Sequence, residues 1–436
     1  MPMEKKQSKK KPKAEGDDGH KKNWREVYAS VEDIQQFLSD RIYLRHNVIT
    51  GRVEFRVPEA DQFTAGSGLP VSGEWQPVSD RVVNSLWAEL SKAKTVRAQD
   101  IYRVMESDLV PDYHPFQAYL GRLPKWDGVS DYILEMSVSV TVKGDVEEQM
   151  LFYDYLKRWL VGMVAGWIDP KVVNNVILVL IGEQGSYKTT WFNYLLPPEL
   201  SRYFYTKTNA SRMGRDDLLT LAQYGLVCCE ELDTMSPRDL NQLKAAVTMP
   251  SIDERAAYAH FHEHRKHIAS FCGTGNNVQF LSDPTGNRRW LPFEVEHIRS
   301  PRDDPFNYEG IYSQAYALYR QGFEYWFSQA EIRRLSAHNE TFEAPNLERD
   351  LIRKYFRPPA PGELGEFVST ADIMQIISGS LTQKLNQNRV GRAMTELGYE
   401  RMRSCGERGY TVVMYSAEEI KARQRMKAAE AKPETG

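Results

Sequence analysis

Gly-Glu-Gln-Gly-Ser-Tyr-Lys-Thr-Thr, residues 182–190, directly follows the apolar run Val-Ile-Leu-Val-Leu-Ile at residues 176–181. An apolar strand that leads into a glycine-rich loop ending in Lys-Thr is typical of a phosphate-binding loop. Such a loop surrounds phosphate oxygens with backbone N–H groups and leads them to the start of the next helix. The stretch therefore predicts an α/β fold with a nucleotide site. The alternative is an ordinary strand-to-helix turn that contains Lys-Thr by chance.

Lys188 is expected to contact the β- and γ-phosphates of ATP, and the Thr189 hydroxyl is expected to hold Mg²⁺. The spacing departs from the GxxxxGK[ST] pattern at one position, where Tyr187 replaces the second glycine. Gly185, two residues earlier, is the candidate for supplying the conformational freedom that this position lacks. The predicted nucleotide-binding residues are Gly182, Gln184, Gly185, Ser186, Tyr187, Lys188, Thr189 and Thr190.

A second apolar run, Leu226–Cys229, ends in the two acids Glu230 and Glu231. In phosphate-loop enzymes, the first such acid binds the Mg²⁺ shell and the second polarises the water that attacks the γ-phosphate. Adjacent carboxylates repel each other unless a cation lies between them, which favours a functional reason for the pair. The alternative is that Glu230 stabilises the N-terminus of a helix.

A third apolar run, Ile268–Cys272, ends in Gly-Thr-Gly-Asn-Asn. An amide at the tip of this strand is suited to sense the γ-phosphate or to orient the attacking water, and we assign that role to Asn276, with Asn277 in reserve. The turn-rich segment that follows contains Arg288 and Arg289. We expect one of them to act as an arginine finger on the ATP of a neighbouring subunit. The alternative is a structural salt bridge.

The segment between the second and third runs is rich in arginine, tyrosine and histidine. His260, His262 and His264 alternate, so on a strand they share one face. A metal site, a hairpin that contacts DNA and a solvated hairpin are the three alternatives. The predicted DNA-contacting residues of this segment are Arg255, Tyr258, His260, His262, Arg265 and Lys266.

The chain has 436 residues, 41% of them apolar, and a formal net charge of −3. This length predicts two to four domains, and the near-neutral charge means that any nucleic-acid surface must be local. The four cysteines, Cys228, Cys229, Cys272 and Cys405, lack zinc spacing and are interpreted as buried, reduced thiols. No apolar run reaches bilayer length and no secretory signal is visible, so we expect a cytoplasmic protein without a membrane partner.

Composition and periodicity predict six segments. They are a lysine-rich tail at 1–23, a mostly helical domain at 24–168, the ATPase core at 169–335, a linker at 336–361, a winged-helix-like domain at 362–416 and a charged tail at 417–436. The winged-helix assignment follows from the order helix, helix, hairpin in the fifth segment. Its second helix carries Arg389 and Arg392, which we expect to contact DNA. The alternative is a packing domain whose arginines face water.

The motifs GEQGSYKTT, LVCCEELD, FCGTGNN and DPTGNRRWLPFEV, in this order, resemble the virulence-associated protein E family of phages and mobile elements. The resemblance covers roughly residues 110–330 and implies a P-loop AAA+-like core with a parallel sheet, related to superfamily three helicases. It implies ATP and Mg²⁺ on Lys188 and Thr189, Mg²⁺ on Glu230, water activation by Glu231 and sensing by Asn276. Glu230 stands where aspartate is common in the wider class.

Three functions are consistent with these residues. The first is an ATP-driven DNA helicase in replication of a mobile element, acting on single-stranded DNA as a ring, expected to be a hexamer, with a separate primase as a partner. The second is an ATP-dependent DNA-binding switch or loader without processive unwinding. The third is a DNA-binding initiation protein with a degenerate loop, which Tyr187 motivates.

Overall fold

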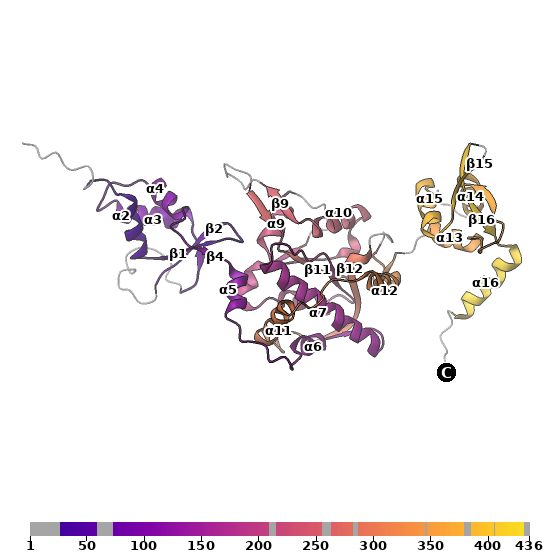
Figure 1. Cartoon of the computed structure of the whole chain (residues 1–436), viewed down its shortest axis with the longest axis horizontal. Helices are drawn as coiled ribbons and strands as arrows, with labels where there is room; N and C mark the ends of the chain where they lie inside the picture. Colours follow the sequence, from indigo (N-terminus) through magenta and orange to yellow (C-terminus); the bar gives the residue numbers. More distant parts are fainter. Residues whose placement is uncertain are drawn as a thin grey trace, which may run out of the picture. The chain divides into compact units, whose positions relative to one another are not determined.

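The structure is a computed structural model that describes residues 27–58, 73–208, 215–254, 263–281, 287–344, 347–378, 385–404 and 406–430 (Figure 1). The chain divides into two compact units by its contacts. Unit 1 comprises residues 1–276 and 288–332, and unit 2 comprises residues 277–287 and 333–436. The fold is mixed α/β with several sheets. Among the described residues, no helix has both the length and the apolar character that crossing a bilayer requires.

The largest sheet of unit 1, called the central sheet here, has the strand order β5-β12-β6-β11-β8-β7. The strands β12, β6, β11, β8 and β7 are parallel, and β5 pairs antiparallel with β12. Their bounds are β5 Val140–Val142, β6 Ile177–Ile181, β7 Phe204–Lys207, β8 Leu226–Cys229, β11 Ser270–Gly275 and β12 Trp290–Ile298. β6, β8 and β11 are buried along their whole length, which explains why they are continuous apolar runs in the sequence.

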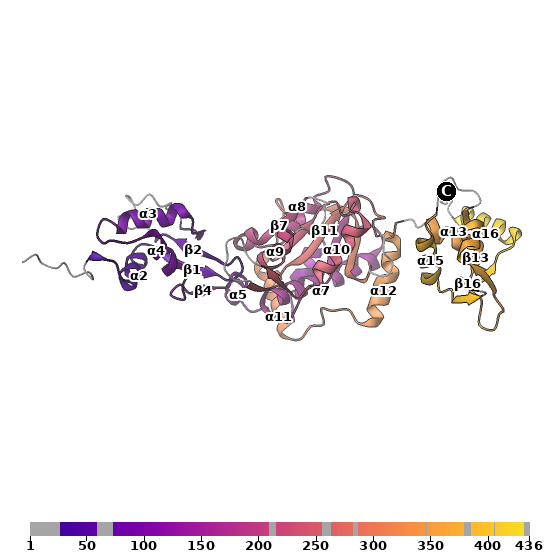
Figure 2. The same ribbon diagram turned by 90° about the horizontal axis from the view of Figure 1, so that it is seen from above.

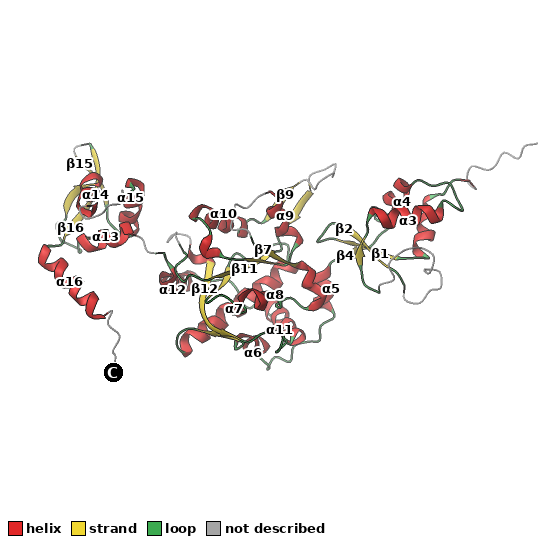
Figure 3. Ribbon diagram, turned by 180° about the vertical axis from the view of Figure 1, so that it is seen from behind, coloured by secondary structure: helices red, strands yellow, loops and turns green. Residues whose placement is uncertain are grey.

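Helices surround this sheet, as Figure 3 shows by colour. They are α5 Pro115–Gly121, α6 Tyr132–Ser137, α7 Val146–Ile168, α8 Lys188–Asn193, α9 Arg215–Gln223, α10 Pro237–Val247 and α11 Tyr308–Arg320. α12, Gln329–Asn339, begins in unit 1 and ends in unit 2. The Asp145 side chain caps α7 by accepting a hydrogen bond from the Glu148 N–H. Two tryptophans fix α7 to the sheet, because Trp159 Nε1 donates to Phe271 O and Trp167 Nε1 donates to Gly225 O. α7 and β5 thus belong to the packing of the central sheet, although both precede residue 169.

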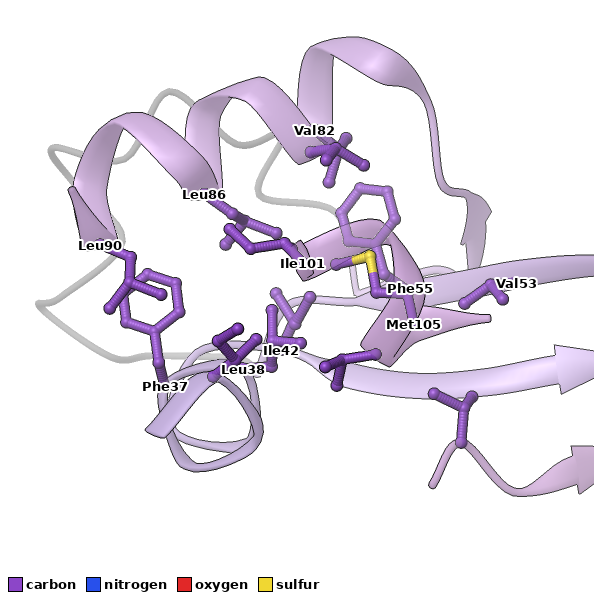
Figure 4. Close-up of a cluster of buried hydrophobic side chains, with 14 of the residues drawn as sticks. Phe37, Leu38, Ile42, Val53, Phe55, Val82, Leu86, Leu90, Ile101 and Met105 are labelled. Carbon is purple, nitrogen blue, oxygen red and sulfur yellow. The ribbon is translucent and has the colours of Figure 1, made fainter. Parts of the chain in front are cut away.

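The N-terminal part of unit 1 has a four-stranded sheet of its own, in the order β3-β2-β1-β4 (Figure 2). Its elements are α2 Val31–Ser39, β1 Tyr43–Asn47, β2 Arg52–Arg56, β3 Gln76–Pro77, α3 Asp80–Leu90, α4 Ala98–Met105 and β4 Asp112–Tyr113. β1 and β2 form an antiparallel hairpin, whose turn contains Gly51 at φ +64°. Apolar side chains from the three helices pack on one side of the strands and form a core (Figure 4).

Unit 2 contains α13 Leu347–Tyr355, β13 Phe356–Arg357, β14 Glu366–Ser369, α14 Thr370–Ser378, α15 Gln387–Glu396, β15 Arg401–Ser404, β16 Glu407–Met414 and α16 Ala417–Glu430. β16 pairs with β13, β14 and β15, all antiparallel. Ser369 caps α14 by accepting a hydrogen bond from the Asp372 N–H. The segment 336–361, expected to be a linker, contains α13, whose Ile352 is fully buried in the core of this unit.

Candidate functional site

The loop after β6 folds around the Lys188 side chain, which is only 7% exposed. Lys188 Nζ donates hydrogen bonds to Gly182 O at 2.9 Å and Glu183 O at 2.6 Å, both within its own loop. It also lies 3.2 Å from Ser186 Oγ and 3.4 Å from Asn276 Oδ1. The ammonium group therefore joins the loop to the residue that follows β11. Lys188 and the predicted sensor Asn276 meet at the carboxyl ends of neighbouring parallel strands.

The backbone of the loop adopts two left-handed conformations. Gly185 has φ +85° and Tyr187 has φ +62°. The Tyr187 position therefore needs the conformation that the expected glycine adopts without strain, and a tyrosine adopts it here. Gly182 is constrained for another reason, since a Cβ there would lie 2.9 Å from Val295 O on β12. The remaining predicted ligands lie at the same loop and helix start, with Gln184 exposed and Ser186, Thr189 and Thr190 half-buried.

The acidic residues after β8 lie at this same edge of the central sheet. Glu230 is half-buried and its N–H donates to Lys207 O, while Glu231 is exposed. Glu231 has φ +52° and precedes the short 3-10 helix η3, Leu232–Thr234. Leu232 of η3 packs on Gly273 of β11, because a Cβ on that glycine would lie 2.3 Å from Leu232 Cδ1. This packing holds the segment 230–234 beside the end of β11.

Asp233 is a third carboxylate at this edge, and the sequence analysis did not identify it. Its Oδ1 lies 3.1 Å from the position that a Cβ on Gly275 would take, directly beside Asn276. Burial lowers the pKa of Lys188, and the charge of Asp233 opposes that shift. The Asp233 side chain is thus electrostatically coupled to the loop lysine. The signal in the sequence was the acid three residues after Glu230, on a segment whose turn geometry the sequence pattern does not define.

Arg288 and Arg289 lie at the opposite edge of the central sheet. They belong to the 3-10 helix η4, Asn287–Arg289, which immediately precedes β12. Trp290 pairs with Ile177, the first residue of β6, whereas the Lys188 loop follows the last residue, Ile181. The length of β6 separates the two edges by about 13 Å. The arginines therefore do not contribute to the loop of their own chain, and no carboxylate of the described residues forms an ion pair with either of them.

The segment expected to form a basic hairpin does pair, with β9 Ser251–Glu254 antiparallel to β10 Glu263–Lys266. Lys266 Nζ donates to the carbonyl oxygens of Gly166 and Asp169 at the end of α7, and burial lowers its pKa to about 8. Its ammonium therefore caps a helix instead of facing solvent. Arg265 is half-buried against Gly51, with Nη2 2.5 Å from a Cβ built on that glycine. Arg255, Tyr258, His260 and His262 lie outside the described residues.

Other candidate chemistry is limited. Cys228, Cys229 and Cys272 are buried. Burial raises the pKa values of Cys229 and Cys272, which favours the protonated form of these two thiols. Cys405 lies outside the described residues. Over the described part of the chain, no three His, Cys, Asp or Glu side chains gather as a metal site.

Unit 2 contains a cavity of about 810 Å³ between the start of α14, one face of α15 and the β15–β16 hairpin. Arg392, Arg401 and Arg408 line it together with Thr370 and Asn388. Arg392 Nε also bonds Glu396 at 2.8 Å, and Arg389 is exposed on the same helix. Arg403 and Arg408 face each other directly in the hairpin register, an arrangement that repulsion disfavours without an anion nearby.

Comparisons with known proteins place these residues in a family. The model of the virulence-associated protein E-like domain matches residues 122–344, which is half of the chain and includes the loop, the acids, Asn276 and both arginines. No curated protein matches the chain. Solved structures of the NrS-1 C-terminal region are similar in outline. Three of them, each apo, have TM-scores of 0.46, 0.47 and 0.48 at 12–13% identity and cover 88% of this chain and 98% of theirs. On the match of the family model, the chain belongs to the virulence-associated protein E-like family.

Proposed function

We propose that this protein is an ATP-dependent DNA helicase or helicase-like ATPase that acts in the replication of a phage or mobile genetic element. The observation that carries the proposal is the Lys188 ammonium, buried at the mouth of a glycine-containing loop and 3.4 Å from Asn276 Oδ1. Glu230, Glu231 and Asp233 follow β8, the strand on the other side of β11, at the same edge. A cationic loop that faces carboxylates and an amide is suited to bind a triphosphate with its Mg²⁺.

The topology supports a P-loop AAA+-like core. When the five parallel strands are numbered by sequence, their order across the sheet is 5-1-4-3-2, with β6 as the first. The chain crosses from β6 to the far edge at β7, returns through β8 and β11, and then passes to the other side of β6 as β12. Ligands of open α/β sheets bind outside the carboxyl ends of the strands where the order reverses. The Lys188 loop lies at that point.

Each residue at this edge has a proposed role in ATP hydrolysis. Lys188 binds the β- and γ-phosphates after giving up its contacts to Gly182 O and Glu183 O, while Thr189 and Glu230 hold Mg²⁺. When bound, Mg²⁺ neutralises charge on the phosphates and supports in-line attack by water. Glu231 accepts the proton of the attacking water, and Asn276 reports the γ-phosphate to β11. Asp233 tunes the charge of Lys188.

The position of Arg288 and Arg289 supports a ring. Because they lie at the far edge of their own sheet, either one reaches a nucleotide only if the site belongs to a neighbouring subunit. A head-to-tail contact of this kind, repeated, closes into a ring. We propose a hexamer whose DNA partner is single-stranded, with primase activity supplied by a separate protein. The arginine-lined cavity of unit 2, including Arg392, is the proposed second contact with the DNA backbone.

The test is ATP hydrolysis by Lys188→Ala with and without single-stranded DNA. We expect DNA-stimulated turnover to fall by about 100-fold or more, because the variant loses the charge that stabilises the transition state. Lys125→Ala, which removes an exposed lysine outside the site, is the matched control and should keep the wild-type rate. Hydrolysis that survives in Lys188→Ala at the control level would show that this loop is not the ATPase site.

The alternative function is an ATP-dependent DNA-binding switch or loader without processive unwinding. The observation that favours it is the left-handed Tyr187 in the loop, where a strained side chain is expected to slow turnover. A strand-displacement assay separates the two functions, since a loader hydrolyses ATP without separating the strands of a forked duplex.

A further inference from the structure

The face of the N-terminal sheet that turns away from the helices carries aromatic and arginine side chains in alternation. On β2, Val53 and Phe55 point into the helical core, so Glu54 and Arg56 point to the opposite face (Figure 4). Arg56 pairs with Tyr43 in the β1–β2 register, which places Tyr43 and Arg45 on that same face. Trp75, just before β3, and Tyr113 of β4 complete it. We call these residues, Tyr43, Arg45, Arg56, Trp75 and Tyr113, the open sheet face.

Rings and guanidinium groups stack on one another across this face. The Arg45 guanidinium carbon lies 3.5 Å from the ring centre of Tyr113 and 4.0 Å from that of Trp75. The Arg56 guanidinium carbon lies 5.2 Å from the ring centre of Tyr43 and 5.3 Å from that of Trp75. Rings and cations therefore follow one another from Tyr113 to Tyr43. Cation–π contacts hold each guanidinium in place and orient the rings.

Positive side chains outnumber negative ones on the open sheet face. Glu54 lies where Arg202 covers this face and is 1% exposed, whereas Tyr43 is exposed. Arg45 and Arg202 share the Glu54 carboxylate, with nitrogen–oxygen distances of 2.7 Å to each. The one negative charge of Glu54 is thus outnumbered by the two positive charges of these arginines. Arg56 has no carboxylate partner among the described residues, and its Nε is buried without a hydrogen-bond partner. Arg52, exposed on the same side of β2, has no ion pair there either. The face is locally cationic in a chain whose net charge is −3.

We propose that the open sheet face binds single-stranded nucleic acid, with unpaired bases stacking on Tyr43 and the phosphate backbone contacting Arg56. Tyr43 is 50% exposed, which leaves room for a base to stack on its ring. Aromatic rings on a sheet beside guanidinium groups form the kind of platform that takes unstacked bases without sequence preference. A duplex hides its base faces, which excludes it from this mode. The site is remote in sequence from the Lys188 loop and needs no ATP hydrolysis.

The first measurement is the affinity of the full chain for a labelled oligodeoxythymidylate by fluorescence anisotropy without nucleotide. We expect Tyr43→Ala to weaken binding by about five-fold or more, the usual effect of losing one stacked base. Arg56→Gln should weaken binding and reduce its dependence on salt. Tyr102→Ala is the matched control, because Tyr102 is 43% exposed on α4 of the same domain, outside this face. Thermal unfolding of each variant verifies its fold.

The second measurement uses the wild-type chain and therefore does not depend on the folding of any variant. Ultraviolet crosslinking to a bromodeoxyuridine oligonucleotide, followed by peptide mapping, should give adducts in the peptides that contain Tyr43 or Trp75. An oligouridylate arm shows whether RNA or DNA is the preferred source of the bases. Equal affinity for Tyr43→Ala, Arg56→Gln and Tyr102→Ala, or no adduct in either peptide, overturns the proposal and leaves the face to a protein partner. Lys188→Ala should keep these adducts, so the result is separate from the ATPase test.

Discussion

Tyr187 and Glu231 are the non-glycine residues of the described chain that have a positive φ, and both border the proposed nucleotide site. Residues in this conformation cost about 1–2 kcal/mol each unless they are glycine. Strain of this kind gathers at functional sites, where the surrounding packing holds it. At Tyr187 the loop keeps the conformation that a glycine would adopt, so the shape of the loop is preserved although the residue differs.

Replacement of this tyrosine by glycine gives a direct measure of the strain. We expect Tyr187→Gly to leave the free energy of unfolding unchanged or to raise it by up to about 1 kcal/mol, because glycine relieves the strain but adds freedom to the unfolded chain. Tyr102→Gly, the same change inside α4, should lower it by about 1 kcal/mol or more. Urea denaturation checks both. A larger loss in Tyr187→Gly than in Tyr102→Gly would contradict the strained-loop interpretation.

The sequence predicts that Lys188 and Asn276 belong to one site, because each follows an apolar run. The structure places these runs in neighbouring parallel strands, with the two side chains 3.4 Å apart. The sequence does not predict Asp233. The placement of that carboxylate depends on the left-handed backbone of Glu231 and on the packing of Leu232 against Gly273, which are tertiary properties. Lys266 was expected to contact DNA, but its ammonium donates a hydrogen bond to Gly166 O at the end of α7. This contact also depends on tertiary packing.

Among the elements, α7 packs against the central sheet and links it to α5. Its Trp167 stacks on Phe116 of α5 at a centroid distance of 4.5 Å and bonds Gly225 O at the start of β8. These contacts join α5, α7 and the start of β8, which are far apart in the sequence. Amphipathic periodicity predicts the helix at 147–167, but pairing of β5 with β12 cannot be recognised from a three-residue strand. In unit 2, the helix α13 likewise lies in the segment 336–361, which the sequence pattern indicated as a linker.

Gly225 tests this packing. A Cβ there would lie 2.6 Å from Phe116 Cζ and 2.9 Å from Trp167 Nε1, whereas a Cβ on Gly121 at the end of α5 meets nothing within 4 Å. We expect Gly225→Ala to lower the free energy of unfolding by about 1–3 kcal/mol through overpacking, and Gly121→Ala to leave it within about 1 kcal/mol. Thermal or urea unfolding of the two variants compares them. Equal free energies of unfolding for the two variants would show that Phe116 and Trp167 move aside at little cost.

At the scale of the whole molecule, the proposed nucleotide site and the proposed arginine finger lie at opposite edges of the central sheet. The Lys188 loop and the acids lie at the carboxyl ends of the strands, and Arg288 and Arg289 lie at the other ends, next to the first residue of β12. If the proposed site binds ATP, a subunit with this polarity presents the nucleotide at one edge and the two arginines at the other. Completion of one site by the next subunit is the simplest use of that arrangement.

Mixing of variants tests completion between subunits. Lys188→Ala retains the arginines, and the double variant Arg288→Ala, Arg289→Ala retains the loop, so each alone should be nearly inactive in ATP hydrolysis. In a random equal mixture, about a quarter of the sites combine an intact loop with an intact neighbouring arginine pair. We expect the mixture to recover up to that fraction of the wild-type rate. No recovery above the sum of the separate variants would exclude the arginine finger in trans.

The most direct test of the nucleotide site is an experimental structure of the chain with Mg²⁺ and a non-hydrolysable ATP analogue. The account predicts that Lys188 Nζ leaves Gly182 O and Glu183 O and bonds the β- and γ-phosphates, with Mg²⁺ between Thr189 and Glu230 and with Asn276 facing the γ-phosphate. A nucleotide bound elsewhere, or a Lys188 that keeps its present contacts while the analogue is bound, would contradict it.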